Sequence, residues 1–136
     1  MTVLKQNTDY ALRAMVHLAG SYADGVVSTK TLALEDEIAE PFAAKILQKL
    51  HKAGLITSTM GPKGGFKLSK PPEMINIKDV IEAMQGPVRV NRCSAGLDQC
   101  PRRRCCPVTG IVDRLDQQLN ISMKKITLKD ILREAK

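Results

Sequence analysis

Tryptophan is absent from the chain, and phenylalanine and tyrosine together supply only 3% of its residues. This scarcity argues against a protein that binds single-stranded nucleic acid by stacking bases on aromatic rings. No run of apolar residues approaches the length of a membrane span, and the beginning of the chain shows no signal-peptide pattern. We therefore expect a soluble, cytoplasmic protein that does not work at a membrane.

Catalytic patterns are missing as well. The two histidines, His17 and His51, are far in sequence from any cysteine, and the chain has neither a phosphate-binding loop nor a paired acid–base candidate. We therefore expect that the chain is not an enzyme. His51 stands beside Lys52 and is expected near a phosphate, whereas His17 is expected to be an ordinary surface or packing residue.

Cysteine is confined to one short segment, RCSAGLDQCPRRRCCPVTG, which contains Cys93, Cys100, Cys105 and Cys106. Clustered cysteines in a cytosolic protein are more often metal ligands or redox-active thiols than structural disulfides. Glycine and proline residues interrupt the segment and keep it irregular, so that several sulfur atoms can converge on one point. The segment is therefore a candidate metal or redox site.

Basic residues outnumber acidic ones by 21 to 14, which gives a net charge of +7. Residues 41–72 contain six lysines and no acidic side chain, and they directly follow an acidic stretch at residues 35–40. Such a one-sided distribution favours a polyanionic partner such as DNA, RNA or an anionic membrane surface over a generic solvated surface.

The apolar periodicity predicts a mainly α-helical chain with one small β-hairpin. A first helix is expected to start near Thr8 or Asp9, with Thr8 as its N-cap, and a second to cover about 32–37 after a Ser28 or Thr29 cap. A third helix is expected to begin at Pro41 and to end at Gly54. The hairpin follows, with strands at 56–60 and 66–68.

Three further helices are expected in the second half of the chain. Apolar residues at 77, 80, 81 and 84 have helical spacing and are followed by Gly86-Pro87, which predicts a helix that stops there. A longer helix is expected over 108–120, and a short one from Thr127 onward. The chain then divides into a DNA-binding domain (1–86), a cysteine-rich loop (87–107) and a dimerisation and C-terminal helical part (108–136).

The order helix, short helix, helix and two-stranded wing is that of a winged helix-turn-helix. In such a domain the third helix reads base edges in the major groove of double-stranded DNA, while the wing contacts phosphates or the minor groove. The candidate DNA-binding residues are Lys45, Gln48, Lys49 and Lys52 on the third helix, and Lys63, Gly64, Gly65 and Lys67 on the wing.

Several longer motifs carry a resemblance to a known family. Together they resemble the iron–sulfur-sensing winged-helix repressors of the IscR, NsrR and CymR type. The motifs are TDYALRAMVHLA, KILQKLHKAGLITSTMGPKGGFKLSKPP, INIKDVIEAMQG, the cysteine segment and ITLKDIL. The resemblance implies a homodimer that binds a palindromic operator under the control of an iron–sulfur cluster sensing iron, redox state or nitric oxide. The family's base-reading positions fall on Ala39, Pro41 and Ala44 here, and a wing arginine falls on Met60, so the operator sequence cannot be carried over.

The cysteines themselves allow three interpretations. An iron–sulfur cluster needs three or four thiolates. A structural zinc site usually contains paired C-x2-C spacing, which is absent here. A thiol switch needs two cysteines of lowered pKa, which the neighbouring arginines 102–104 could provide. A zinc-dependent or thiol-switch regulator is therefore the alternative to the cluster.

The resemblance implies a ligand set for the cluster. Cys93, Cys100 and Cys106 have the spacing C-x6-C-x5-C, and the fourth ligand would be Asp9 of the partner subunit or Cys105. The IscR-type histidine ligand is replaced by Thr109, so that a [4Fe–4S] cluster is favoured over [2Fe–2S].

An apolar stripe marks the helix after the cysteines, and it consists of Val108, Ile111, Val112, Leu115 and Leu119. The resemblance implies that this helix pairs with its copy in the dimer. A helix that packs on its own core would show the same pattern.

Overall fold

The computed structural model describes residues 4–90 and 105–134, so Cys93, Cys100 and arginines 102–104 lie outside the described residues. The elements are α1 (Gln6–Gly20), η1 (Tyr22–Asp24), α2 (Thr29–Glu35), α3 (Glu40–Lys52), β1 (Ile56–Thr59), β2 (Gly65–Leu68), η2 (Pro72–Met74), α4 (Ile77–Gln85), α5 (Thr109–Lys125) and α6 (Leu128–Glu134). The strands form one antiparallel hairpin. This order confirms the predicted mainly α-helical fold with a small hairpin and a long helix near the end of the chain.

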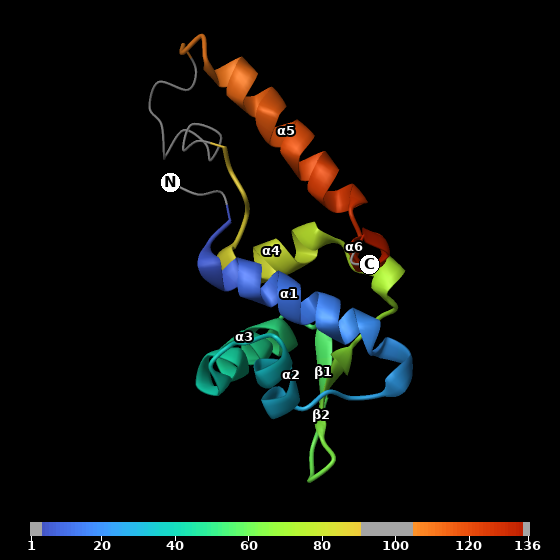
Figure 1. The fold of residues 1–136 in the computed structure, drawn as a ribbon. Coiled ribbons are helices and arrows are strands. Elements are labelled where there is room, and N and C mark those ends of the chain that lie inside the picture. The colour runs from blue at the N-terminus through green and yellow to red at the C-terminus, as the bar shows by residue number, and fades with distance from the viewer. Residues whose placement is uncertain (1–3, 91–104, 135–136) are drawn as a thin grey trace.

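The first helix, α1, lies across the middle of the molecule (Figure 1) and packs against α3, α4, α6 and β2. Its buried side chains recur at helical spacing and are Thr8, Ala11, Ala14, Met15, Leu18 and Ala19. Thr8 was expected to cap the helix, and this expectation is wrong because the helix begins two residues earlier, at Gln6. The Thr8 hydroxyl is buried and donates a hydrogen bond of 2.7 Å to Oε1 of Gln85.

The second and third helices meet at a tight turn below α1. Ser28 caps α2 as predicted, because its hydroxyl accepts a hydrogen bond of 3.1 Å from the backbone N–H of Thr31. The helix ends at Glu35 rather than Glu37, since Glu37 has a φ of 55°, which a right-handed helix cannot contain. The α3 helix begins at Glu40, so that Pro41 lies in the first turn, where its missing N–H costs no helical hydrogen bond.

The hairpin pairs Ile56 with Leu68 at its base and Thr59 with Gly65 at its outer end. Two glycines are required by the backbone there. A Cβ atom on Gly64 would lie 2.1 Å from the carbonyl oxygen of Thr59, and one on Gly65 would lie 2.3 Å from that of Val27. Val27 and Phe66 exchange two backbone hydrogen bonds of 2.8 Å, so the hairpin is joined to the chain just before α2.

The remaining helices lie on the other side of α1. Asn76 caps α4, and the predicted apolar positions of this helix face inward, with Val80, Ile81 and Met84 buried. The α6 helix returns to pack on α1. Asp130 accepts a hydrogen bond of 2.9 Å from the backbone N–H of Thr127, and this bond lowers the pKa of the Asp130 carboxyl.

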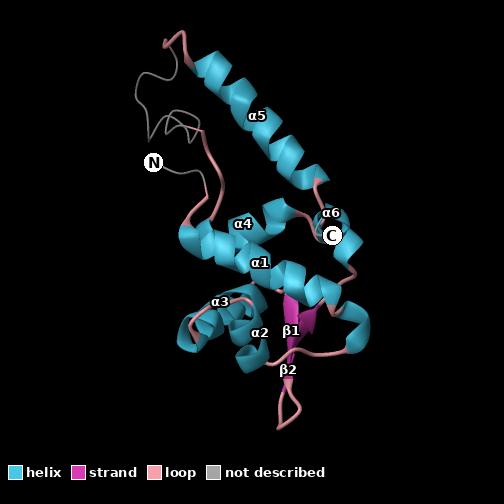
Figure 2. Cartoon of the chain, viewed as in Figure 1, coloured by secondary structure: helices cyan, strands magenta, loops and turns pink. Residues whose placement is uncertain are grey.

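The fifth helix is longer than the predicted range of 108–120, because it continues to Lys125. It projects from the body at the end opposite the hairpin (Figure 2). A second apolar cluster joins it to α4 and contains Ile81, Val88 and Met123, with Leu12, Ile77 and Leu119 packed against them. The earlier part of α5 extends beyond this cluster.

The glycine requirement of the hairpin can be tested by stability. Replacing Gly64 with alanine should lower the free energy of unfolding by about 1–3 kcal/mol, because the Thr59 carbonyl must move to admit the methyl group. The matched control is Gly110→Ala on α5, where nothing lies within 4 Å of the added Cβ. The control should be neutral or slightly stabilising. Equal urea midpoints for the two variants would contradict the steric argument.

Candidate DNA-binding surface and cysteine segment

The outward face of α3 is the first part of the candidate site. Ala43, Ile46, Leu47 and Leu50 are buried on one side of this helix. Lys45, Gln48 and Lys52 are exposed on the opposite side, together with Pro41. Because residues three, four and seven apart share a helix face, the predicted reading residues Lys45, Gln48 and Lys52 form one continuous row.

Lys49 differs from the other predicted DNA-binding lysines. Its amine donates a hydrogen bond of 3.1 Å to the backbone carbonyl of Met84, in the last turn of α4. Carbonyl groups in a final helical turn have no partner within the helix, and the negative end of the helix dipole attracts a cation there. Lys49 therefore joins α3 to the end of α4.

The wing presents its basic residues unequally. Lys63 is exposed at the tip. Lys67 is half-buried, and its amine lies 5.3 Å from the centroid of the Tyr22 ring, at cation–π distance. Gly64 and Gly65 occupy positions where a side chain would collide with the backbone. Gly64 lets the hairpin turn close, whereas Gly65, the first residue of β2, lets the hairpin approach the backbone of Val27.

His17 is not the ordinary surface or packing residue that we expected. Its ring is largely enclosed, with Nε2 lying 2.9 Å from a carboxylate oxygen of Glu35 and Nδ1 lying 3.2 Å from one of Asp36. The imidazole thus connects α1 to the end of α2, just before α3.

Of the cysteine segment, the structure describes only residues 105–110. Cys105 is exposed and Cys106 is half-buried, both immediately before α5. The convergence of Cys106 with Cys93 and Cys100 lies outside the described residues. Within residues 4–90 and 105–134, no three His, Cys, Asp or Glu side chains are grouped closely enough to hold a metal ion.

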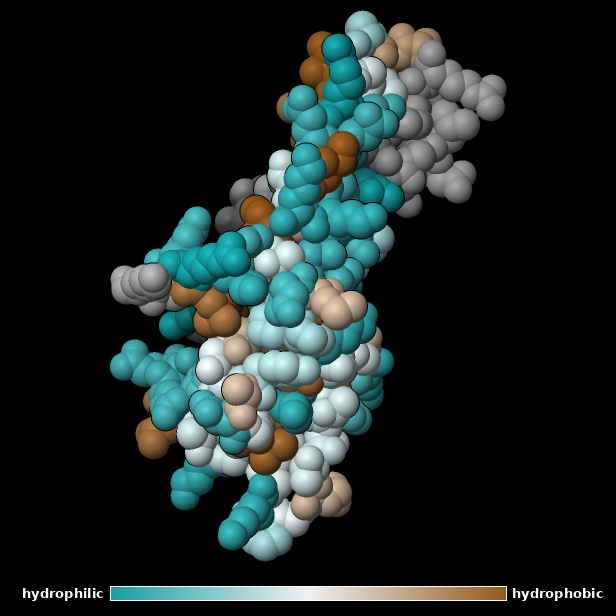
Figure 3. Space-filling model, turned by 90° about the vertical axis from the view of Figure 1, so that its right-hand side faces the viewer, coloured by the Kyte–Doolittle hydropathy of each residue, from teal (hydrophilic) through white to brown (hydrophobic). Residues whose placement is uncertain are grey.

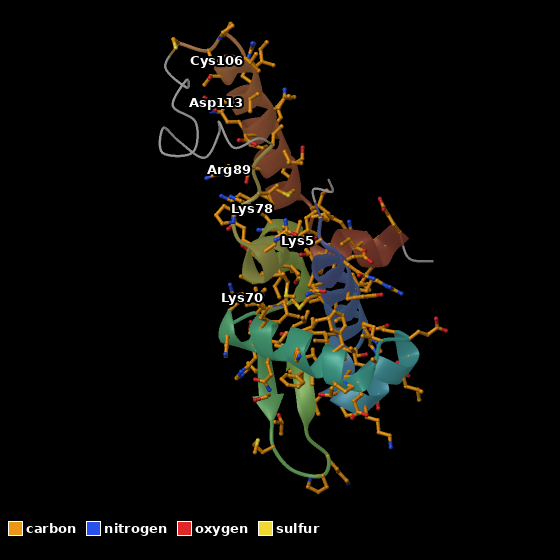
Figure 4. All side chains as sticks on the ribbon, turned by 90° about the vertical axis from the view of Figure 1, so that its left-hand side faces the viewer. Lys5, Lys70, Lys78, Arg89, Cys106 and Asp113 are labelled. Carbon is orange, nitrogen blue, oxygen red and sulfur yellow. The ribbon has the colours of Figure 1, made fainter. Side chains whose placement is uncertain are left out.

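Asp9, a predicted alternative ligand, is exposed in the first turn of α1. One of its carboxylate oxygens lies 4.0 Å from the guanidinium group of Arg13. In Figure 4, Cys106 lies at the outer end of α5, well away from Lys5 just before α1. A single chain therefore does not bring Asp9 to Cys106.

The stretch just before the cysteine segment is fastened to α5. The backbone N–H of Val90 donates a hydrogen bond to the carboxylate of Asp116, which is only 7% exposed. The side-chain amide of Asn120 donates to the Asp116 backbone carbonyl at 2.8 Å, and Val88 is buried beside α5. Sequence reasoning missed Asp116, although an acidic residue four positions after the inward-facing Val112 was a usable signal.

The end of the segment leads directly into the same helix. Thr109, the first residue of α5, lies three positions after Cys106. Within the described part of the chain, its hydroxyl is the buried side-chain polar atom that makes no hydrogen bond. Buried polar groups usually have a partner, so this hydroxyl has a hydrogen-bonding capacity that the described residues do not use.

The residues of the predicted apolar stripe on α5 lie within about 100° of each other around the helix, but they differ in exposure. Val112 is buried and Leu119 packs against the body of its own chain, whereas Val108, Ile111 and Leu115 are about half exposed, at 51%, 54% and 47%. Figure 3 shows apolar residues along this projecting part of the molecule. An exposed apolar row on a projecting helix is typical of a protein–protein contact.

None of the helices in residues 4–90 and 105–134 combines the length and the apolar character that a membrane crossing requires.

Comparison with known proteins identifies the family. Residues 4–134 match the Rrf2 family, described as an iron-dependent transcriptional regulator. The chain is 31% identical to the HTH-type transcriptional regulator NsrR of Halalkalibacterium halodurans over 131 residues, which span 95% of this chain and 89% of that protein.

Two solved structures have the same fold over nearly the whole chain. IscR of T. potens has a TM-score of 0.78 at 25% identity and covers 98% of this chain and 88% of its own. CymR, the global cysteine regulator of B. subtilis, has a TM-score of 0.78 at 26% identity and covers 98% of each chain. These relatives are transcriptional regulators, in agreement with the expectation that the chain is not an enzyme. From its sequence match and its fold, the chain belongs to the Rrf2 family of transcriptional regulators.

Proposed function

We propose that this chain is a homodimeric DNA-binding repressor whose affinity for a palindromic operator is set by an iron–sulfur cluster bound to the cysteine segment. The observation that carries the proposal is the connection of the cysteine segment to the candidate DNA-binding helix α3 and to the long helix α5. The DNA-facing helix α3 is bonded to the end of α4, and the chain that continues from α4 into the cysteine segment is bonded to α5.

In this proposal, α3 of each subunit enters the major groove of one half-site. Lys45, Gln48 and Lys52 face the DNA from that helix, while Lys63 and Lys67 reach the backbone from the wing with the bare backbone of Gly64 and Gly65. Lys49 serves mainly as a positioning residue, since its amine already has a carbonyl partner. The net charge of +7 supports attraction to phosphate.

The chemistry of the donors fits an iron–sulfur cluster. Cys93, Cys100 and Cys106 would hold it, with Asp9 of the partner subunit or Cys105 as the fourth ligand. The unpaired Thr109 hydroxyl beside Cys106 can donate a hydrogen bond to a nearby sulfur. When bound, a [4Fe–4S] cluster would supply metal–thiolate bonds that are sensitive to iron loss, oxidation or nitric oxide.

The residues of the chain then transmit the state of the segment. Both of its ends meet α5, one through Val90 and Asp116 and the other through Thr109. Its beginning is also continuous with the end of α4, which Lys49 joins to α3. A change in the segment would therefore shift α5 and α3 together. In this proposal the protein is cytoplasmic and has three parts. Residues 1–86 would bind DNA, residues 87–107 would sense the signal, and residues 108–136 would form the dimer contact.

A thiol switch or zinc site is the second candidate. Its support is the likeness to CymR, described as a cysteine regulator, together with the exposure of Cys105 next to the half-buried Cys106. The same connections to α3 and α5 would serve either chemistry, so the cofactor must be measured directly.

Anaerobic purification should yield a brown protein that contains iron and sulfide. The variant Cys106→Ser should lose the cluster. The ratio of operator affinities between cluster-loaded and cluster-free protein should then fall by at least a factor of ten, which corresponds to about 1.4 kcal/mol. Iron and sulfide analysis with operator titration provides the measurement, and Arg114→Ser on α5 is the control.

Zinc without sulfide, or a reversible disulfide, would favour the second candidate. An iron-free protein that binds its operator unchanged after all four cysteines are replaced by serine would refute sensing altogether.

The proposed DNA contacts should appear in the salt dependence of binding. Replacing Lys45 or Lys63 with alanine should reduce the slope of log affinity against log salt by about one per subunit, because each lysine neutralises one phosphate. Lys49→Met should leave the slope nearly unchanged but lower the free energy of unfolding by about 1 kcal/mol through loss of its hydrogen bond. Identical salt slopes for the wild-type protein and for the Lys45→Ala and Lys63→Ala variants would exclude these contacts.

The dimer surface can be tested with a matched pair of exposed residues on α5. Leu115→Glu should produce monomers in sedimentation velocity experiments, because a charge would be buried in the contact. Ile121→Glu is the control, since Ile121 is 54% exposed but lies about 120° away from Leu115 around the helix. Dimers in both variants would place the subunit contact elsewhere.

A further inference from the structure

Arginine is missing from the whole DNA-facing part of the chain. No arginine occurs between Arg13 and Arg89, a range that includes α2, α3 and the hairpin. Arg13 itself lies over the Tyr10 ring, at 5.5 Å from the centroid, and near Asp9. Arginine is the usual reader of guanine in the major groove and the usual side chain inserted into a narrow minor groove. This surface must therefore obtain its specificity by other chemistry.

The outward face at the beginning of α3 carries small apolar residues beside one acidic residue, the exposed Glu40 that starts the helix. Its outward row starts with Pro41 and the half-buried Ala44, and only then continues with Lys45 and Gln48. In helix-turn-helix proteins, the N-terminal residues of the recognition helix contact base edges. Small apolar side chains there contact the thymine methyl group, and glutamine pairs with adenine.

The tip of the wing is apolar as well. Met60 is 92% exposed and is followed by Gly61, which has a φ of 107°, and by Pro62. The turn is closed by a hydrogen bond of 2.9 Å from the Gly64 N–H to the Gly61 carbonyl. Because no Cβ fits at Gly64, the backbone of this turn is tightly constrained. Its apolar side chains are therefore displayed rather than folded back onto the protein.

We propose that this protein recognises its operator mainly by apolar contact. Thymine methyl groups in the major groove contact Pro41 and Ala44, Gln48 pairs with a neighbouring adenine, and Met60 with Pro62 contacts the minor groove at an A·T-rich, easily unstacked step. The lysines then hold phosphates and contribute affinity without sequence information. The inference rests on the proposed DNA-binding function and adds the chemistry of the operator to it.

The first experiment selects binding sites from random duplex DNA with the full chain, in cluster-loaded and cluster-free forms. A·T-rich half-sites with thymines opposite α3 are expected. Replacing those thymines with deoxyuridine, which lacks only the methyl group, should lower the affinity about fourfold per methyl. In the Ala44→Gly variant, deoxyuridine should no longer lower the affinity at the one base pair that Ala44 contacts. The readout is the ratio of affinities for thymine and deoxyuridine DNA, and a general loss of protein stability does not change this ratio.

The second experiment compares two exposed methionines. Met60→Ala should lower the affinity several-fold and flatten the preference at the base pairs facing the wing, without changing the salt slope. Met74→Ala is the matched control, since Met74 is 62% exposed on η2 and should have no effect. Met60→Arg should instead increase the salt slope by about one per subunit.

The outcomes separate this inference from the proposed function. Sites with guanine opposite α3, or affinities unaffected by both deoxyuridine and Met60→Ala, would overturn apolar recognition while DNA binding itself stands. Failure of both protein forms to select any sequence would overturn the proposed function.

Discussion

The end of α4 is held from two directions, and the arrangement of the molecule depends on this junction. Lys49 reaches it from α3 through the Met84 carbonyl. From the other side, the Thr8 hydroxyl and the Lys5 backbone N–H both donate to Oε1 of Gln85. These bonds satisfy polar groups that a helix end would otherwise leave unpaired. They also fix the direction in which the chain leaves toward the cysteine segment.

The long helix α5 divides its sides between two tasks. Met123 and Leu119 keep it on the body of its own chain, and the buried carboxylate of Asp116 fastens the stretch just before the cysteine segment to it. The adjoining side of the same helix carries Ile111 and Leu115, which are about half exposed. The chain on both sides of the cysteine segment therefore meets this helix, at Asp116 through Val90 and at its first residue, Thr109.

The DNA-facing surface combines basic charge with few polar groups able to distinguish bases. Lysines are distributed over α3 and the hairpin, but one is committed to α4 and another lies over Tyr22. Glu35 and Asp36, which would repel phosphate near α3, are engaged by His17. The charge of this surface is therefore supplied by lysines, and Pro41 and Met60 are exposed apolar residues on it.

Local patterns in the sequence were sufficient for most of the fold. The apolar spacing of α4, the Ser28 cap and the glycine-rich hairpin involve residues within about one or two helical turns of each other, so they can be read directly from their order. The family motifs likewise identified a winged-helix regulator. The boundaries of α1 and α5 were less predictable, because packing against distant elements decides where a helix begins or ends.

The connections between elements were decided only by the tertiary structure. Thr8 meets Gln85 across 77 positions, Lys49 meets Met84 across 35, Asp116 meets Val90 across 26 and His17 meets Asp36 across 19. A lysine, a threonine or an acidic residue on a helix has the same local pattern whether water or a remote helix end satisfies it. Composition and periodicity determined which helices form and which faces are apolar, whereas the partners of the polar side chains depended on how those helices pack.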